Sequence, residues 1–329
     1  MFEYRLQRLG RIPVAFELNQ RGLELWERMA EEAESLRVRV HEGPKQGRLI
    51  DLGINVPGGL EAGRRMAEVA LAGLGQVTFV PAAAELGGGP AVMVRTDHPV
   101  AACMASQYAG WKIATKGFFA MGSGPMRAAA AVEELFQKIG HTERAEHVVG
   151  MLETRQMPGD DVWQLIAEKC GVAPSRVHLL AAPTASQAGT VQVVARSVET
   201  ALHKLWELGF DLTRIESGWG VAPLPPVAGD DLAAIGRTND AILYGGNVTL
   251  WVRGDDDSLE AIGPDIPSSA SPDYGRPFAD VFAVYDQDFY RIDPQLFSPA
   301  QVTLVNLDTG NSFRFGELRP DVIRQSFGS

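Results

Sequence analysis

The stretch VHLLAAPTASQAG, residues 177–189, contains the junction from which the fold is predicted. Its apolar run Val177–Ala182 predicts a strand. The segment Pro183–Ser186 follows at the end of that strand and leads through Gly189 into the longest predicted helix, Thr190–Leu208, which Gly209 ends. A strand therefore runs directly into a long helix near the middle of the chain.

The chain before this junction alternates between helical and strand patterns. Asn19 is predicted to be the N-cap of a first amphipathic helix, because apolar residues recur after it at helical spacing as far as Leu36. The other elements predicted upstream are strands at 38–40, 49–54, 77–80, 91–94 and 147–152, and helices through 66–74 and near 99–109, 126–139 and 160–169.

The last third of the chain has a different pattern. Strands are predicted at Ala241–Tyr244 and Val248–Val252, and Val302–Asn306 is predicted to pair with Ser312–Phe315 as a hairpin. Residues 254–277, rich in Asp, Ser and Pro, are predicted to form a surface loop or a connection between subdomains. Strands and helices alternate without a regular βαβ period, so we predict an α+β fold with mixed or antiparallel sheets, and not a Rossmann sheet.

The composition indicates a globular chain that can bury a sizeable core, since 45% of its 329 residues are hydrophobic. A formal net charge of -11 argues against nucleic acid or an anionic membrane surface as a partner. Cys103 and Cys170 lie far apart in sequence, as is typical of proteins in a reducing cytoplasm. The N-terminus lacks the features of a signal peptide, and no apolar run approaches the ~20 residues that span a bilayer. We therefore expect a cytoplasmic protein.

Several common catalytic motifs are absent from the sequence. It contains no GxGxxG, GxxxxGK[ST], HExxH or GxSxG pattern, and its six histidines never stand at a metal-ligand spacing from one another. These absences weaken the case for dinucleotide oxidoreductases, P-loop enzymes, zincins and serine hydrolases. We expect neither a metal nor a cofactor.

A glycine loop at residues 119–127 opens one of the predicted helices. The junction of loop and helix offers free backbone N–H groups and the positive end of a helix dipole, which suit a phosphate or a carboxylate. Ser123, Gly124 and Arg127 are the predicted anion-binding residues. The alternative is a tight turn into a helix with no ligand.

The long helix predicted after Ser186 carries a polar stripe. At about 100° per residue, four side chains fall within roughly 60° of one another on this helix: Gln192, Arg196, Glu199 and His203. One interpretation is a solvent face with an Arg196–Glu199 pair. The other is a carboxylate beside a guanidinium, facing a cleft.

The third polar stretch is residues 236–246, which contain Arg237, Asn239, Asp240 and Tyr244. Asn239 and Asp240 together could offer donors and acceptors to the edge of a heterocycle, and Tyr244 could stack or hydrogen-bond. The alternative is a capped turn before a strand.

These stretches resemble one known family, that of the methenyltetrahydromethanopterin cyclohydrolases. The similarity runs from about residue 19 to the C-terminus. The segments that carry it are Thr96-Asp97-His98-Pro99, Met121-Gly122-Ser123-Gly124-Pro125, Ala182-Pro183-Thr184-Ala185-Ser186, Arg196-Ser197-Val198-Glu199-Thr200, Gly236-Arg237-Thr238-Asn239-Asp240-Ala241-Ile242-Leu243-Tyr244-Gly245-Gly246 and Asp288-Phe289-Tyr290-Arg291-Ile292-Asp293-Pro294.

The resemblance implies reversible hydrolysis of 5,10-methenyl-tetrahydromethanopterin to the 5-formyl compound, in one-carbon metabolism and without metal or nucleotide. It assigns Glu199 as general base and Arg196 as the residue that tunes it. The substrate-binding residues are then Ser123, Gly124, Arg127, Thr184, Ser186, Arg237, Asn239, Asp240 and Tyr244.

The resemblance also implies a homotrimer whose subunit has two α/β domains, intertwined in sequence, with the substrate pocket between them. We place domain A at 19–95 plus 285–329 and domain B at 96–284. Two departures from the family pattern are residues 1–18, an extension, and Met126, where a small residue is expected.

Two other functions remain open at this point. One is hydrolysis of the methenyl group on folate, and the other is a non-catalytic pterin carrier. The presence of both Arg196 and Glu199 argues against the carrier.

Overall fold

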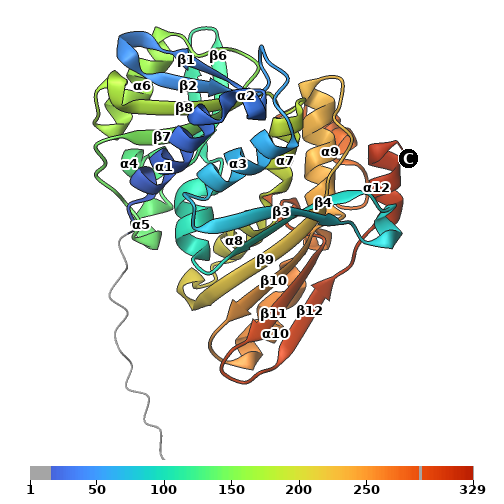
Figure 1. The fold of residues 1–329 in the computed structure, drawn as a ribbon. Coiled ribbons are helices and arrows are strands. Elements are labelled where there is room, and N and C mark those ends of the chain that lie inside the picture. The colour runs from blue at the N-terminus through green and yellow to red at the C-terminus, as the bar shows by residue number, and fades with distance from the viewer. Residues whose placement is uncertain (1–15, 289–290, 329) are drawn as a thin grey trace, which may run out of the picture.

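The computed structural model describes residues 16–288 and 291–328 (Figure 1). Most of the predicted extension at 1–18 therefore lies outside the described residues, as do Phe289 and Tyr290 of the motif at 288–294. The described chain builds two six-stranded sheets with helices packed against them. No helix in the described ranges combines the length and the apolar character needed to cross a membrane.

The first sheet has helices on both faces. Its strands, in spatial order, are β1 (Arg39–Glu42), β2 (Arg48–Asp51), β8 (Val177–Ala182), β7 (Val148–Glu153), β6 (Phe118–Ser123) and β5 (Trp111–Thr115). The central strands β2, β8 and β7 are parallel, and the outer pairs are antiparallel. Every residue of β8 is buried because both faces of the sheet are covered.

Alternate residues of the first sheet serve two separate cores. Val149 and Met151 of β7 pack with α1 (Leu18–Glu31) and α3 (Leu60–Ala70). Val148 and Leu152, which point the other way, pack with α6 (Asp160–Cys170) and with Met126 of α4 (Met126–Ala130).

The second sheet is mostly antiparallel. Its strands, in spatial order, are β12 (Ser312–Gly316), β11 (Gln301–Asn306), β10 (Asn247–Val252), β9 (Ile215–Pro223), β4 (Pro90–Thr96) and β3 (Gly75–Pro81), of which only β10 and β11 run parallel to each other. One face buries its apolar residues against α8 (Ser197–Glu207) and against α9 (Asp231–Leu243), α11 (Phe278–Val284) and α12 (Pro320–Phe327).

The remaining elements are short. They are α2 (Ala33–Leu36), α5 (Phe136–Ile139), α7 (Gln187–Val194), α10 (Asp256–Ile262), a π-helix η3 (Val100–Gln107), and the 3-10 turns η1 (Pro44–Gln46), η2 (Ala84–Leu86), η4 (Pro174–Arg176), η5 (Leu212–Arg214), η6 (Gly263–Asp265), η7 (Ser268–Ala270) and η9 (Pro294–Leu296).

The mixed sheets confirm the predicted α+β class and its intertwined chain path. Residues 39–51 and 111–182 supply the strands of the first sheet, whereas residues 75–96 and 215–316 supply those of the second. The predicted domain boundaries themselves stay a prediction. The strands predicted near 77–80, 91–94, 147–152 and 177–182 and the hairpin at 302–315 are confirmed.

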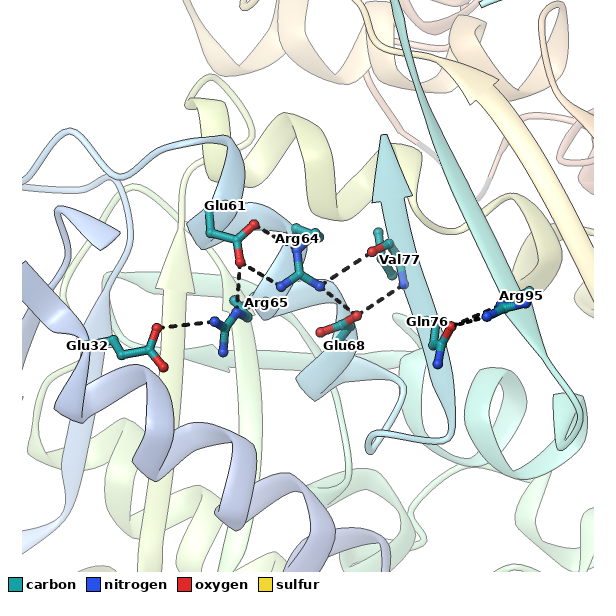
Figure 2. A network of polar contacts seen from close by, with 8 residues as sticks. All are labelled: Glu32, Glu61, Arg64, Arg65, Glu68, Gln76, Val77 and Arg95. Atoms are coloured by element: carbon teal, nitrogen blue, oxygen red, sulfur yellow. Dashed lines mark hydrogen bonds and ion pairs between the residues drawn. The ribbon is translucent and has the colours of Figure 1, made fainter. Parts of the chain in front are cut away.

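A network of charged side chains joins helix α3 to Glu32 at the end of α1 and to β3 of the second sheet (Figure 2). β3 is an edge strand, and the backbone of its Val77 hydrogen-bonds to side chains of α3: the Val77 N–H donates to Glu68 and Arg64 donates to the Val77 carbonyl. Glu61 binds both Arg64 and Arg65, and the hydrogen bond from Arg64 is the main reason that the pKa of Glu61 falls to about 2. The network satisfies polar backbone groups that an edge strand would otherwise leave open.

The predicted cap at Asn19 is wrong. The first helix begins at Leu18, and Asn19 lies buried inside it. The Asn19 amide donates to the Pro125 carbonyl at 3.0 Å and to Glu143, and its oxygen accepts from the Val149 N–H. A residue type that favours caps is used here to join α1 to the first sheet, because a buried amide needs partners on every side.

Three further predictions of local structure are wrong. The long helix Thr190–Leu208 is two helices, α7 and α8, interrupted at Ala195 and Arg196. The strand predicted at 241–244 is the end of α9, whose N-cap Asp230 accepts from the Ala233 N–H. A short apolar run does not by itself distinguish a strand from a buried helix. The loop predicted at 254–277 contains α10.

The helices predicted near 99–109 and 126–139 differ in detail. The first is the π-helix η3, and the second is divided into α4 and α5 by Ala131, which has a φ of 44°. Both changes lie close to the candidate site.

Gly63 is the position where α3 and α7 approach most tightly, and it gives a test of this packing. A Cβ at Gly63 would lie 2.8 Å from the Cα and carbonyl oxygen of Ala188. Gly63→Ala gains helix propensity but forces the backbones apart, so we expect a net loss of about 1–2 kcal/mol in the free energy of unfolding, measured by urea titration. Gly229→Ala is the control, because a Cβ there meets nothing within 4 Å. An unchanged stability of Gly63→Ala would show that this packing is looser than described.

Candidate functional site

The break between α7 and α8 is held by the side chain and backbone of Gln107. The Gln107 amide donates to the Ala195 carbonyl at 3.0 Å, and Arg196 Nη1 donates to the Gln107 carbonyl at 2.7 Å. Gln107 is fully buried and is the last residue of η3. The first bond satisfies a backbone carbonyl at the break, and the second satisfies the carbonyl at the end of η3.

The carbonyl end of η3 also contacts a second arginine. Arg127 Nη1 donates to the carbonyls of Met104, at 2.8 Å, and Ser106, at 3.3 Å. Arg127 is fully buried and forms an ion pair with Glu133 at 2.9 Å. π-Helical turns are frequent at functional sites, and here the turn brings two guanidinium groups to one end of a buried helix.

Arg196 also belongs to a chain of polar side chains. Its Nη2 donates to the Ser123 hydroxyl at 3.2 Å and to the Gln192 side-chain oxygen at 3.0 Å. The Gln192 amide donates to Glu153 at 3.2 Å, and the Thr184 hydroxyl donates to the other oxygen of Glu153 at 2.5 Å. The chain joins residues at the ends of β6 and β7 and just after β8.

Glu199 lies in the first turn of α8, one turn after Arg196. Burial raises the pKa of its carboxyl to about 7, although the charges of Arg196 and Arg127 act in the opposite direction. Cys103 lies in η3 and Tyr108 directly follows it. The pKa of the Cys103 thiol and of the Tyr108 phenol is raised, first by burial and second by the charge of Glu199. Glu199 is therefore a carboxyl that changes charge near neutral pH.

Burial decides between the two interpretations of the polar stripe. Gln192, Arg196 and Glu199 are 1%, 7% and 5% exposed. His203 stacks on Tyr108 with ring centroids 4.6 Å apart. The interpretation of the stripe as a solvent face is wrong, because the side chains of Gln192, Arg196 and Glu199 are buried.

The predicted anion loop lies next to this cluster. Ser123 is buried and accepts from Arg196, and Gly124 has a φ of 90°, a conformation that favours glycine. The guanidinium of Arg127 packs against the rings of Tyr108 and Phe136 in addition to its pairing with Glu133. The predicted anion contacts of Ser123, Gly124 and Arg127 stay predictions.

The segment after β8 is tied to α9. The Ser186 hydroxyl caps α7 by accepting from the Gly189 N–H, and Thr184 binds Glu153. The Ala185 N–H donates to Asp231, the first residue of α9.

The third stretch lies on α9 and not in a loop at a strand entrance. Asp240 accepts from the Phe278 N–H, and burial raises its pKa to about 7. The Tyr244 hydroxyl donates to the Arg276 carbonyl and accepts from the Gly275 N–H. Asn239 donates to the Ile235 carbonyl and Arg237 to the Pro226 carbonyl. The predicted ligand contacts of these four residues stay predictions, and Asp240 and Tyr244 already serve the fold.

The sequence analysis missed Glu153 and Gln107. Neither belongs to a recognisable motif. In the sequence Glu153 directly follows the strand predicted at 147–152, and in the structure it contacts Thr184 of the polar segment 183–186. Two surface hollows lie elsewhere, and neither is lined by Arg196 or Glu199. One is lined by residues 16–18, 20 and 140–147, and the other by residues in or next to β3, β4, β9, β10 and β11.

Comparison with known proteins gives a consistent result. Residues 17–327 match the family model described as Cyclohydrolase (MCH). The chain is 50% identical over 304 residues to the methenyltetrahydromethanopterin cyclohydrolase of Xanthobacter autotrophicus, covering 92% of this chain and 90% of that protein. It is 48% identical over 286 residues to the protein of the same name from Rhodopirellula baltica, covering 85% and 86%. A relative of that name from Methanococcoides burtonii is 39% identical over 313 residues, covering 94% and 98%.

The raised pKa of Glu199 gives a test that does not depend on activity. The folded chain holds the Glu199 proton up to about pH 7, whereas the unfolded chain releases it near 4.5, so this group favours folding below about 4.5 and loses that contribution as pH rises through 7. Glu199→Gln should therefore stabilise the protein at pH 8, by up to about 3 kcal/mol, and much less at pH 5.

The measurement is urea unfolding at both pH values. Glu168→Gln, on an exposed position of α6, is the control and should change stability equally at both. Equal effects of Glu199→Gln at pH 5 and pH 8 would contradict the raised pKa.

Proposed function

The chain belongs to the cyclohydrolase (MCH) family, and from this membership we infer that it is a methenyltetrahydromethanopterin cyclohydrolase. It is a hydrolase that converts 5,10-methenyl-tetrahydromethanopterin reversibly to the 5-formyl compound in one-carbon metabolism. The match covers nearly the whole described chain, and the three relatives each align over at least 85% of it.

The reaction needs little more than a positioned water molecule and a base. The methenyl carbon is an electrophilic, amidinium-like cation, so water attacks it once a proton can be removed from that water. The tetrahedral adduct then breaks its bond to one ring nitrogen, which gains a proton while the adduct's hydroxyl loses one, and the formyl group stays on the other nitrogen. A carboxylate near the methenyl carbon would also favour the cationic substrate.

Glu199 is the proposed base. The observation that supports this role is its burial beside two arginines, with a pKa of about 7, because a general base works best when its pKa lies near the operating pH. A pKa near 7 leaves a useful fraction of the carboxyl ionised while keeping it basic enough to take a proton from water.

Arg196 is proposed to tune and place that base. Its charge lowers the pKa of Glu199, and its guanidinium is fixed by Gln107, Ser123 and Gln192. Guanidinium geometry is planar and offers several donors at once, so lysine is not an equivalent replacement.

The substrate is proposed to lie beside the α7–α8 break. The proposed contacts nearest to this break lie in or beside the hydrogen-bonded network around Arg196. They are Ser123, Gly124, Thr184 and Ser186. Arg127 is the contact proposed on α4, and the part proposed on α9 and the residue after it consists of Arg237, Asn239, Asp240 and Tyr244.

The assembly and location are also proposals. The family resemblance supports a homotrimer, and the two free cysteines fit a reducing cytoplasm. We propose that turnover requires neither metal nor nucleotide. Light scattering of the purified protein tests the trimer, and turnover after treatment with a chelator tests the metal.

Replacing the proposed base tests the function directly. Glu199→Gln keeps the shape of the side chain but removes the base, so kcat should fall roughly 10²–10⁴-fold with KM little changed, followed by loss of the methenyl absorbance. Arg196→Lys should also lower kcat, because it cannot keep the three contacts of the guanidinium.

The control is Glu168→Gln, which should turn over like the wild type. A folded Glu199→Gln variant within a few-fold of wild-type kcat would eliminate this mechanism. Faster turnover of methenyl-tetrahydrofolate than of the methanopterin substrate would overturn the substrate assignment.

A further inference from the structure

Gln192 lies between one group that can only donate hydrogen bonds and another that can only accept them. On one side, the guanidinium of Arg196 can only donate hydrogen bonds, and it lies 3.0 Å from the Gln192 oxygen. On the other side, the carboxylate of Glu153 can only accept, and it lies 3.2 Å from the Gln192 nitrogen. The amide satisfies both neighbours in one orientation.

The reversed orientation is costly at this position. It would direct the amide N–H₂ at a guanidinium and the amide oxygen at a carboxylate, in a side chain that is 1% exposed. Buried polar groups without partners are destabilising, since water cannot reach them. The acceptor oxygen of Glu153 thus selects which end of the Gln192 amide faces Arg196.

Glu153 is itself fixed. The Thr184 hydroxyl donates to Oε1 of Glu153 at 2.5 Å, and Gln192 binds Oε2, so the two contacts hold both oxygens. Glu153 ends β7, and Thr184 follows the end of the neighbouring parallel strand β8. The anchor is therefore built at the ends of two neighbouring central strands of the first sheet.

We propose that Glu153 is a positioning residue for the hydrolysis, which acts through Gln192 to hold the Arg196 guanidinium beside Glu199. The inference rests on the proposed function of Glu199 and Arg196. Glu153 acts on the reacting atoms only indirectly, through Gln192 and Arg196. These contacts are called the relay below.

The charged groups around Glu199 predict how its pKa would change if the relay were lost. Arg196 precedes Glu199 in α8 and Arg127 faces it from α4, while Cys103 and Tyr108 face it from η3 and its end. The arginines lower the pKa of Glu199 and so keep the base available near neutral pH. An Arg196 that has moved away leaves Glu199 protonated to higher pH.

The test compares Glu153→Ala with Glu153→Gln. Alanine removes the anchor, so we expect kcat to fall on the order of 10–100-fold with KM within a few-fold, and the acid limb of the kcat–pH profile to move to higher pH. Glutamine can still offer an oxygen to the Gln192 amide and an N–H₂ group to the Thr184 hydroxyl, so Glu153→Gln should retain kcat within a few-fold and keep the wild-type profile.

Two more variants complete the design. Gln192→Leu removes the relay at its middle and should reproduce Glu153→Ala, and the double variant should be no worse than Gln192→Leu alone. If the alanine variant does not fold, Gln192→Leu measured against Glu153→Gln carries the same test. Glu168→Ala, an exposed glutamate replaced in the same way, should leave both kcat and the pH profile unchanged.

Three results would overturn the proposal: an unmoved acid limb in Glu153→Ala, a raised KM with unchanged kcat, or a Glu153→Gln variant as impaired as Glu153→Ala. The second would make Glu153 a substrate contact, and the third would make its charge the functional property. Glu199→Gln distinguishes failure of this inference from failure of the proposed function. If Glu199→Gln loses activity while the acid limb of Glu153→Ala does not move, only this inference fails, and if Glu199→Gln stays active, the proposed function fails.

Discussion

The hydrogen bonds between Gln107 and the break at Ala195–Arg196 fix the geometry on which the site depends. A continuous helix would keep Arg196 on a face set by helical periodicity and would leave the Gln107 carbonyl without its partner. The interruption turns Arg196 toward Gln107, Ser123 and Gln192, and it starts a new helix whose first turn holds Glu199. The Gln107 amide satisfies the Ala195 carbonyl at the break, and the Arg196 guanidinium satisfies the Gln107 carbonyl at the end of η3.

Burying so many charged groups in one place is costly unless each is paired or hydrogen-bonded. Arg127 meets this condition through Glu133 and two carbonyls. Arg196 donates to three oxygen acceptors through Nη1 and Nη2, while its buried Nε has no partner among the described residues. Glu199 is different, because its burial raises its pKa to about 7 and so lets it exist uncharged. Structural ion pairs and a titrating carboxyl thus lie side by side, and strongly perturbed carboxyls of this kind gather at functional sites.

The two sheets contribute different things to this arrangement. The first sheet, covered on both faces, supplies Ser123, Glu153 and Thr184 from its strands or directly after them. The helix layer of the second sheet supplies Gln192, Arg196 and Glu199, and Asp231 of α9 binds the segment after β8. A side chain held from two layers loses freedom in more directions than one held from a single helix, which favours a fixed catalytic geometry.

The sequence by itself determined much of the local structure and the family. The apolar run at 177–182 and the alternating patterns at 77–80 and 91–94 predicted strands that are present, because periodicity reflects which faces are buried. The polar stretches containing Ser123, Arg196 and Asp240 were long and specific enough to indicate the family, which the similarity over residues 17–327 shows. Arg196 and Glu199 could be named from the same pattern.

Only the tertiary structure decided how those residues are arranged. The break in the helix at Arg196 depends on Gln107, 88 residues before Ala195, and Asn19 is held by Pro125, 106 residues away. The apolar end of α9 resembled a strand because its neighbours, α11 and α12, are distant in sequence. Burial of the polar stripe, the pKa of Glu199 and the link from Glu153 to Arg196 arise from contacts between segments that no local pattern joins. Local sequence fixes periodicity, whereas the desolvation and pairing of a charged group depend on everything that surrounds it.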